Sequence, residues 1–305
     1  MQLECFEKRW GGCRRPRCSN TAAGRFAANV NLNTIKEVMQ PRSADEIVKW
    51  RPSYAWLAGG TWLFSTPQIA TDTLIDLRSL KWPSLEASET GLDIAATCTI
   101  AELYHFKPPA DWIAAPLFQL CSRAFLASFK IWNAATVGGN ICMSLPAGPM
   151  VTLTTALEAR HTLIPRDGAP REVAAIDFVT SNHANVLQPG ELLRNIHIPA
   201  RALHKRFASH RSSLTHLGRS AVFLIGTRSA DDSDLLLTIT AATPRPVQIK
   251  FDRAPSATEL RHAIDEAVPT NGYFDDVHGS PAYRRRLTYY YAEQIRAELE
   301  KGAAA

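Results

Sequence analysis

The sequence lacks the features that define several large protein classes. None of its apolar runs approaches the roughly 18–20 residues that span a bilayer, which excludes an integral membrane protein. Of its 305 residues 46% are hydrophobic and 21% charged, a balance that excludes a disordered or collagen-like chain. The net charge of +5 lies mostly in residues 1–30, where six basic residues face two acidic ones. The rest of the chain is close to neutral, so we expect no nucleic-acid partner.

The cysteine pattern lacks both a CxxC pair and a preceding secretory signal. We therefore expect a cytoplasmic protein whose six cysteines stay reduced. Residues 1–32 predict a flexible basic arm, rich in Gly, Arg and Pro. Two alternatives for this segment are an Arg-rich transit peptide and a metal knuckle formed by Cys5, Cys13 and Cys18. The absence of a nearby fourth ligand argues against the knuckle.

Familiar catalytic motifs are also missing. The sequence contains no GxGxxG after a strand, no GxxxxGK[ST], no HExxH and no GxSxG. A Rossmann domain, a P-loop enzyme, a zincin and an α/β-hydrolase therefore have no support. The nine histidines are scattered without paired spacing, so we expect no metal site.

Hydrophobic periodicity divides the remainder into two regions. In residues 33–201 short strand-like runs alternate with helical ones, which indicates an α/β or α+β domain with mixed sheets. Residues 202–305 predict an antiparallel meander followed by two helices that cover one face of its sheet. Ser280 and Pro281 suit the start of the last helix, whose Leu287, Tyr291, Ile295 and Leu299 form an apolar stripe for core packing.

Two similar loops stand out in the first region. Ala58-Gly59-Gly60-Thr61 and Val137-Gly138-Gly139-Asn140 each follow an apolar, strand-like stretch and end in a short polar residue. Paired glycines permit positive φ and expose successive amide groups, which form a nest for an anion. A single such pair is usually only a turn. Two of them in this context favour a dinucleotide diphosphate held from two sides by a cradle that is not a Rossmann fold.

At these loops the chain resembles the flavin-binding medium subunits of molybdenum hydroxylases, the xanthine dehydrogenase, aldehyde oxidase and carbon monoxide dehydrogenase family. The resemblance rests on LAGGTWLFS, TLIDLRSL, IAATCTIAEL, ASFKIWNAATVGGNI, LQPGELLRNIHIP, TPRPVQI and DDVHGSPAYRRRL, which follow in the family's order. It covers about residues 33–300. The implied fold class is α+β, with a two-part FAD-binding domain of the vanillyl-alcohol-oxidase type at 33–201 and a smaller C-terminal α+β domain of an antiparallel sheet plus helices at 202–305.

The resemblance also implies a cofactor site. It implies FAD contacts at Trp56, Leu57, Ala58, Gly59, Gly60, Thr61, Trp62, Leu126, Ala135, Thr136, Val137, Gly138, Gly139, Asn140, Leu193 and His210. Leu126 and Leu193 suit core positions equally well. Thr61 stands where covalently flavinylated relatives in the wider fold have a histidine, so the FAD is expected to be non-covalent. No catalytic residue is expected, because the cofactor carries the redox chemistry.

The family's partners follow from the same resemblance. A large molybdenum-cofactor subunit and a small 2Fe-2S subunit would pass electrons to this chain's FAD, and NAD or another acceptor would receive them. Only Cys142 lies where some members carry an iron–sulfur insertion, so neither iron–sulfur nor molybdenum is expected in this chain. One departure concerns Pro149, which occupies the position of a family Asp and puts one cofactor hydrogen bond in doubt. Two other readings stay open: a scaffold or assembly subunit with a degenerate flavin site, and a stand-alone FAD-dependent oxidase.

Overall fold

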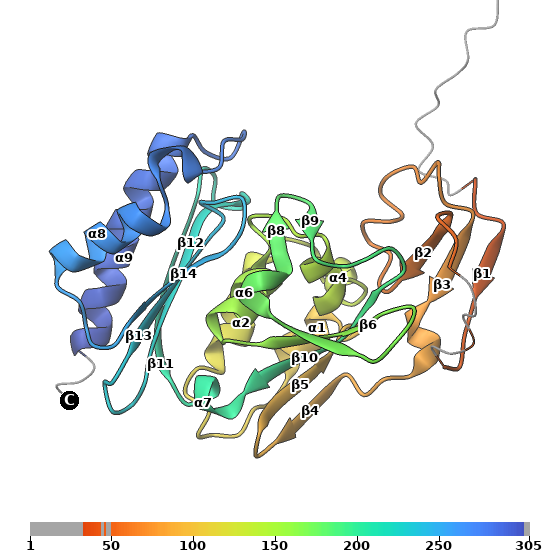
Figure 1. Cartoon of the computed structure of the whole chain (residues 1–305), viewed down its shortest axis with the longest axis horizontal. Helices are drawn as coiled ribbons and strands as arrows, with labels where there is room; N and C mark the ends of the chain where they lie inside the picture. The colour runs from red at the N-terminus through yellow and green to blue at the C-terminus, as the bar shows by residue number, and fades with distance from the viewer. Residues whose placement is uncertain (1–32, 44–45, 47–49, 302–305) are drawn as a thin grey trace, which may run out of the picture.

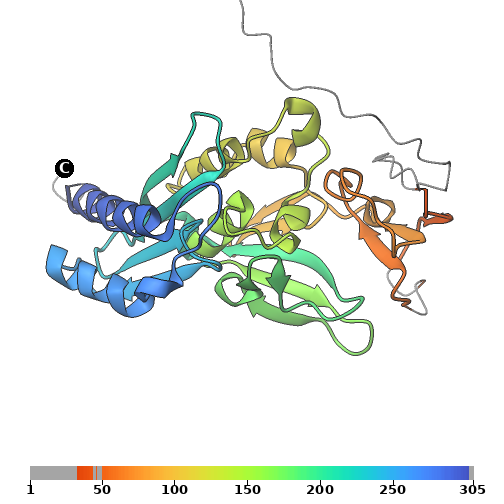
Figure 2. The same ribbon diagram turned by 90° about the horizontal axis from the view of Figure 1, so that it is seen from above.

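The computed structural model of the chain describes residues 33–43, 46 and 50–301. The predicted basic arm and its cysteines Cys5, Cys13 and Cys18 lie outside these residues. Three main sheets follow one another along the longest axis of the molecule, and the first of them stands somewhat apart from the other two (Figures 1 and 2).

The first sheet is small and parallel. Its order is β1-β3-β2, from β1 (Glu37–Met39), β2 (Tyr54–Leu57) and β3 (Thr73–Asp76). The central strand β3 is buried along its whole length, as its apolar TLI sequence predicts. Asp76 then accepts a hydrogen bond from the Arg78 amide and starts the short 3₁₀ helix η2 (Leu77–Leu80). The predicted strand that enters the first Gly-Gly loop is therefore confirmed as β2.

The second sheet is antiparallel and carries the main core. Its strand order is β4-β5-β10-β6-β7. The strands are β4 (Leu85–Ser88), β5 (Gly91–Ala95), β6 (Arg160–Ile164), β7 (Arg171–Ala174) and β10 (Leu192–Pro199). In β10 the buried Ile196 and Ile198 alternate with the half-buried Asn195 and His197, so only one face of the sheet enters the core.

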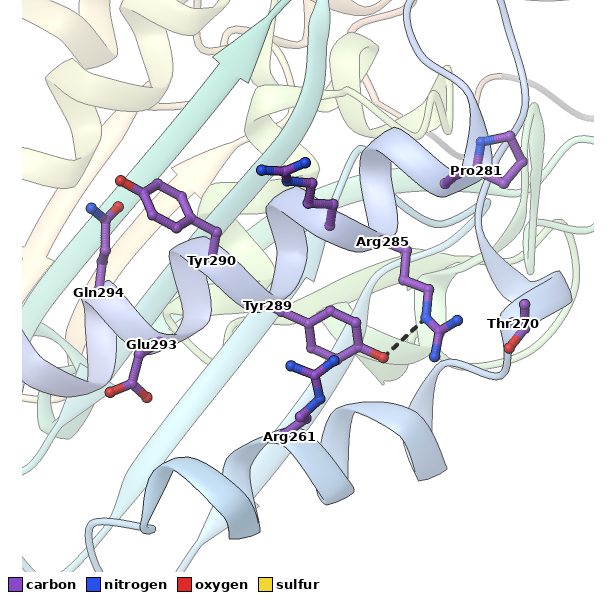
Figure 3. A pocket seen from close by; sticks show the side chains of 10 residues that line it. Arg261, Thr270, Pro281, Arg285, Tyr289, Tyr290, Glu293 and Gln294 are labelled. Carbon is purple, nitrogen blue, oxygen red and sulfur yellow. Dashed lines mark hydrogen bonds between the residues drawn. The ribbon is translucent and has the colours of Figure 1, made fainter.

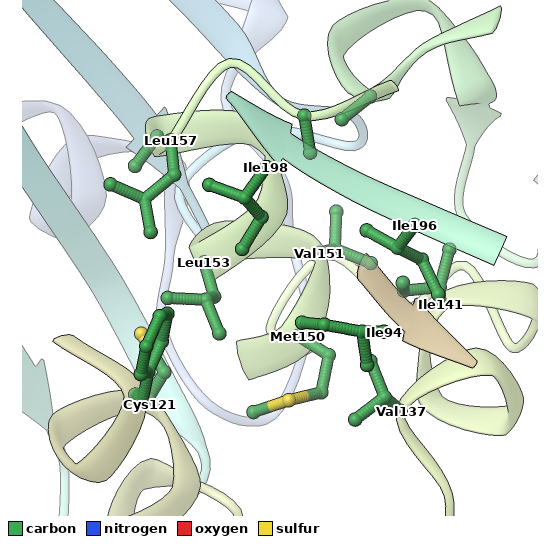
Figure 4. Packing of buried hydrophobic residues seen from close by; sticks show 14 of the residues in the cluster. Ile94, Cys121, Val137, Ile141, Met150, Val151, Leu153, Leu157, Ile196 and Ile198 are labelled. Atoms are coloured by element: carbon green, nitrogen blue, oxygen red, sulfur yellow. The ribbon is translucent and has the colours of Figure 1, made fainter. Parts of the chain in front are cut away.

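Helices cover that buried face (Figure 4). They are α1 (Ile100–His105), α2 (Pro116–Ala124), α4 (Val137–Cys142), α5 (Pro149–Ala156), α6 (Ala175–Phe178) and α7 (Ala200–Leu203), with the hairpin β8 (Val179–Ser181) and β9 (Ala184–Asn185) beside them. The short α3 (Phe129–Trp132) has no buried residue and contacts α1. At the start of α1, Thr99 and Glu102 form a capping box. All eight residues of α5 are buried, which makes it the central helix of the molecule.

One core residue is a histidine with no polar partner. His161 on β6 is 1% exposed, and neither ring nitrogen has a hydrogen-bond partner among the described residues. Its ring meets that of Phe178 edge-on at 5.0 Å between centroids. Burial lowers the pKa of His161 from 6.5 to about 3, so the ring is neutral in the folded protein.

We expect this histidine to weaken the fold in acid. Between pH 6.5 and 3 the unfolded chain takes up a proton at His161 that the folded chain does not. The stabilisation of the fold by the neutral His161 is therefore fully present above pH 6.5 and is lost as the pH falls. The loss between pH 7 and pH 4.5 is about 2–3 kcal/mol. Urea unfolding of wild type and His161→Leu at both pH values checks this, because titrating carboxylates contribute equally to both proteins. An identical pH dependence in the two would contradict it.

The third sheet forms the predicted antiparallel meander, in the order β11-β12-β13-β14. Its elements are β11 (Arg206–Ser213), β12 (Ser220–Arg228), β13 (Leu235–Thr240), β14 (Val247–Phe251), α8 (Ala257–Ala267), η3 (Thr270–Gly272) and α9 (Pro281–Lys301). The prediction that helices cover only one face was incomplete. Helices α8 and α9 cover the outer face (Figure 2), while α5 packs on the other and joins it by a 2.7 Å hydrogen bond between the hydroxyls of Thr152 and Thr240. Covering on both faces explains why every residue of β12 and β13 is buried.

Helix α9 begins as predicted, and its predicted apolar stripe packs on the core together with further buried positions. Pro281 is its first residue, and the Ser280 hydroxyl accepts a hydrogen bond from the Tyr283 amide. Ile295 and Leu299 are buried as expected, whereas Leu287 and Tyr291 are only partly buried. The buried positions are Arg284, Thr288, Ala292, Ile295 and Leu299. The buried set is wider than the apolar stripe because Arg284 and Thr288 find buried polar partners, which the periodicity of apolar residues does not reveal.

Candidate functional site

The two predicted loops converge on one cavity of about 480 Å³ between the first sheet and α4. This volume is in the range of small-molecule and cofactor sites. Ten of the predicted residues line it: Trp56, Ala58, Gly59, Gly60, Thr61, Trp62, Ala135, Thr136, Gly139 and Asn140. The other lining residues are Leu63, Ser65, Phe125, Ile131, Cys142, Met143 and Leu145.

The first loop provides free hydrogen-bond donors. Gly60 has a φ of +69°, and the carbonyl oxygen of Gly60 accepts a hydrogen bond from the Phe64 amide, which closes the turn. Within the part of the chain that the structure describes, the amides at positions 59–62 donate to no protein acceptor. A run of uncommitted amide groups on the wall of a cavity is the physical form of an anion nest.

Gly59 brings the two halves of the cavity together. A Cβ placed on it would lie 1.8 Å from the carbonyl oxygen of Ala134, which precedes the second loop. Only a residue without a side chain allows this approach. Behind the loop, Trp56 packs on Trp50 with 5.0 Å between ring centroids.

The second loop differs from the predicted nest. It is not preceded by a strand, because α3 lies there, and its glycines form the first turn of α4. Its amides are already used: Val137 donates to the Cys98 carbonyl, Gly138 to the Ala96 carbonyl and Gly139 to the Thr136 hydroxyl. A Cβ on Gly138 would lie 2.5 Å from that of Ala96, so this glycine serves close packing. The second loop forms a wall of the cavity, and the anion nest is confined to the first loop.

Asn140 connects the cavity to α5. Its Oδ1 accepts a hydrogen bond of 3.0 Å from the Met150 amide at the start of α5, where the N-cap Gly148 has no side chain to do so. Pro149 is the first residue of that helix and is buried outside the cavity. The Asn140 oxygen is therefore engaged, which leaves its amide NH₂ to face a ligand.

Six of the predicted residues lie away from the cavity. Leu57, Val137 and Gly138 are buried behind its walls. Leu193 is 3% exposed in the core, opposite Leu163 in the sheet, and Leu126 is 39% exposed next to the lining residue Phe125.

His210, the sixth of these residues, faces α9. Its Nε2 lies 2.7 Å from the Glu298 carboxylate, and its ring stacks on Tyr291 at 5.3 Å between centroids. The histidine thus contacts the helix on the outer face of the third sheet, away from α5.

Sequence reasoning missed seven lining residues. Leu63 and Ser65 continue the first loop, and Cys142, Met143 and Leu145 follow the second, so longer windows around the loops would have found them. Phe125 and Ile131 lie between α2 and α4, where no local pattern marks them.

None of the described residues that line the cavity is suited to act as a general base. The acidic side chain among them is the Cys142 thiol, and burial raises its pKa to about 12. Over residues 33–43, 46 and 50–301, no group of three His, Cys, Asp or Glu side chains could hold a metal ion, and no helix is long and apolar enough to cross a membrane.

Comparison with known proteins agrees with this geometry. Residues 31–201, more than half of the chain, match the family described as the FAD binding domain in molybdopterin dehydrogenase. The carbon monoxide dehydrogenase medium chain of Afipia carboxidovorans is 31% identical over 147 residues, 47% of this chain and 50% of that one. A xanthine dehydrogenase of Oryza sativa subsp. japonica is 27% identical over 122 residues, 38% of this chain and 9% of that one. The matched regions thus span half or less of these curated relatives.

Solved structures share the fold. A chain of quinoline 2-oxidoreductase from Pseudomonas putida 86 superimposes with a TM-score of 0.71 and 20% identity, over 88% of this chain and 97% of that one. A chain of carbon monoxide dehydrogenase from Hydrogenophaga pseudoflava gives a TM-score of 0.69 and 19% identity, over 85% and 95%. The α+β architecture with its two-domain layout is therefore the one that the resemblance implied. On the family match over residues 31–201, the chain belongs to the FAD-binding domain family of molybdopterin dehydrogenases.

Proposed function

We propose that the chain is the FAD-binding electron-transfer subunit of a molybdenum hydroxylase-type oxidoreductase. The observation that carries the proposal is the run of uncommitted amides at positions 59–62 on the wall of the cavity. Together with Gly59 and Gly60, where a side chain would fill the space, these donors fit the diphosphate of a dinucleotide. FAD, when bound, supplies the redox chemistry.

The residues of the cavity would bind FAD without a covalent link. The amides of the first loop would hold the diphosphate, and the Asn140 NH₂ would donate to it from the opposite wall. Thr61 lines the cavity at the position that implied non-covalent binding, and its side chain cannot form the histidyl link of covalent relatives. No assigned contact requires position 149, since the Asn140 oxygen already accepts a hydrogen bond from the Met150 amide at that helix start.

Electron transfer between subunits suits the chemistry of the site better than direct oxidation of a substrate. A stand-alone oxidase needs a base near the flavin, and the described lining residues offer only the protonated Cys142 thiol as a titratable group. A degenerate scaffold is disfavoured because the nest of the first loop is intact. NAD or another carrier would be the acceptor of the electrons.

Exposed apolar side chains beside the cavity support a docking partner. Trp62 on the first loop is 48% exposed and Phe64 43%, while Phe129 between α2 and α4 is 71% exposed. Such a group of large apolar side chains is typical of a protein interface. We propose that the 2Fe-2S and molybdenum subunits assemble with this chain. We also propose that its two domains divide at residues 201 and 202, where the family match ends, within α7 and shortly before β11.

An absorption spectrum tests the proposal. The purified chain, or the apo chain incubated with FAD, is expected to show a flavin spectrum, and denaturation followed by filtration should release free FAD. A flavin retained on the unfolded chain would contradict non-covalent binding. Failure to bind FAD at all would overturn the proposed function.

Asn140→Asp tests where the diphosphate lies. The substitution keeps the oxygen that accepts from the Met150 amide, so the stability of the fold should not change. It also adds a negative charge to the cavity wall, and we expect FAD to bind roughly tenfold more weakly at low salt. The exposed Asn182→Asp is the matched control and should bind as wild type does. Equal FAD affinity of Asn140→Asp and wild type would place the diphosphate elsewhere.

A further inference from the structure

A second groove lies on the outer side of the molecule, between α8 and α9 (Figure 3). Its volume is about 880 Å³. The lining residues are Arg261, Thr270, Pro281, Ala282, Arg285, Arg286, Tyr289, Tyr290, Glu293 and Gln294. Neither the FAD cavity nor its loops contribute to this groove.

Internal ion pairs leave the groove with an unbalanced positive charge. Arg285 is paired with Asp265 at 3.2 Å, and Glu293 with Arg296 at 2.7 Å. Arg261 and Arg286 form no salt bridge with any residue that the structure describes. Arg261 also lies close enough to Asp265 to help lower the pKa of that carboxyl, so its charge is balanced in part. The lining as a whole still has three arginines and only one glutamate, which leaves a surplus of positive charge.

Aromatic rings lie between these charges. The guanidinium of Arg261 lies 4.5 Å from the centroid of the Tyr289 ring, and that of Arg285 lies 5.5 Å from it. Arg285 also donates from Nε to the Tyr289 hydroxyl, as Figure 3 shows. Tyr290 on the same helix is 57% exposed. Arginine and tyrosine are the residue types that concentrate binding energy at protein interfaces.

The shape of the groove distinguishes between possible ligands. From Pro281 to Gln294 it follows α9 for roughly 20 Å at 1.5 Å per residue. A small anion needs several donors that converge on one point. The Arg285 guanidinium already donates hydrogen bonds to Asp265 and Tyr289, so it is not free to bind such an anion. An elongated groove lined by arginine and tyrosine side chains fits a peptide with acidic and apolar residues.

We propose that this groove docks an acidic, partly apolar segment of a protein partner. The acidic side chains would pair with Arg261 and Arg286, and the apolar ones would pack on Tyr289 and Tyr290. The chain's own residues 1–32 do not suit the groove, because their surplus of charge is also positive.

Fluorescence anisotropy with a labelled synthetic peptide tests the proposal on the full chain. The probe has fourteen residues, with glutamates in its first half and leucine and phenylalanine at its centre, and a second probe carries lysine in place of glutamate. We expect the acidic probe to bind, with weaker binding at high salt, and the lysine probe not to bind. The double variant Arg261→Gln/Arg286→Gln should weaken binding about tenfold.

A charge-matched variant and a small anion complete the test. Lys81→Gln/Lys107→Gln removes two exposed positive charges elsewhere and should leave binding unchanged. Thermal unfolding of both double variants checks that the fold is intact. Three results would overturn the proposal: no binding of the acidic probe, equal binding of the two probes, or wild-type binding by the arginine variant. Displacement of the acidic probe by equimolar pyrophosphate would also overturn it, in favour of a small-anion site.

Discussion

Replacing Arg284 by methionine is expected to reduce the free energy of unfolding by about 3–5 kcal/mol, the cost of breaking a buried ion pair. The side chain is 1% exposed and donates to the carbonyl oxygens of Gly279, Ala221 and Ala241. It also pairs with the Asp276 carboxylate. Methionine fills a similar volume but leaves three carbonyl groups without the guanidinium donor and the half-buried Asp276 carboxylate without its cation.

Urea unfolding followed by circular dichroism measures this loss. Arg286→Met is the matched control, because it makes the same change two residues later on α9, at an arginine without a salt bridge to the described residues, and should cost less than 1 kcal/mol. Arg284→Lys keeps one charged donor and is expected to fall between the two, which preserves the comparison if Arg284→Met does not fold. A loss below 1 kcal/mol for Arg284→Met would show that the network does not stabilise the fold.

Arg284 also shows which features of the fold the sequence cannot predict. The strands β2, β3 and β11 to β14, the capping box at Thr99 and the start of α9 follow from local signals, namely alternation, turn residues and caps. The partners of Arg284 come from the strand ends of β12 and β13 and from the 276–279 turn, up to 63 positions away along the chain. An apolar stripe read from the helix alone cannot predict a buried charge whose partners are so distant.

The candidate site also combines features that the local sequence predicts with features that depend on distant contacts. The positive φ of Gly60 and the free amides of the first loop are local properties of a Gly-Gly turn after a strand. The second loop has a similar local sequence, but α4 begins there. Its amides donate to the carbonyl groups of Ala96 and Cys98 and to the Thr136 hydroxyl. The difference depends on tertiary contacts, so the two loops could not be distinguished before the structure.

Gly59→Ala is expected to have the larger effect on function, lowering FAD affinity by at least a hundredfold. The new Cβ would lie 1.8 Å from the Ala134 oxygen and 2.7 Å from its carbonyl carbon, and both atoms are backbone. No side-chain rotation can relieve this contact, so the first loop must move away from the second. The amide groups of the first loop would then no longer be positioned on the cavity wall to bind the diphosphate. Overpacking of this kind also costs about 1–3 kcal/mol of stability.

The measurement separates these two effects. FAD bound per chain is obtained from absorbance, its affinity from titration of the apo protein, and stability from thermal unfolding. Gly272→Ala is the control, since its nearest neighbour would be 3.3 Å away and its φ is not positive. Full FAD binding by Gly59→Ala with a normal affinity would show that the contact between the loops does not shape the site. A loss of stability with unchanged affinity would assign Gly59 to packing alone, and the amides of the first loop would then have to bind the diphosphate without support from the second.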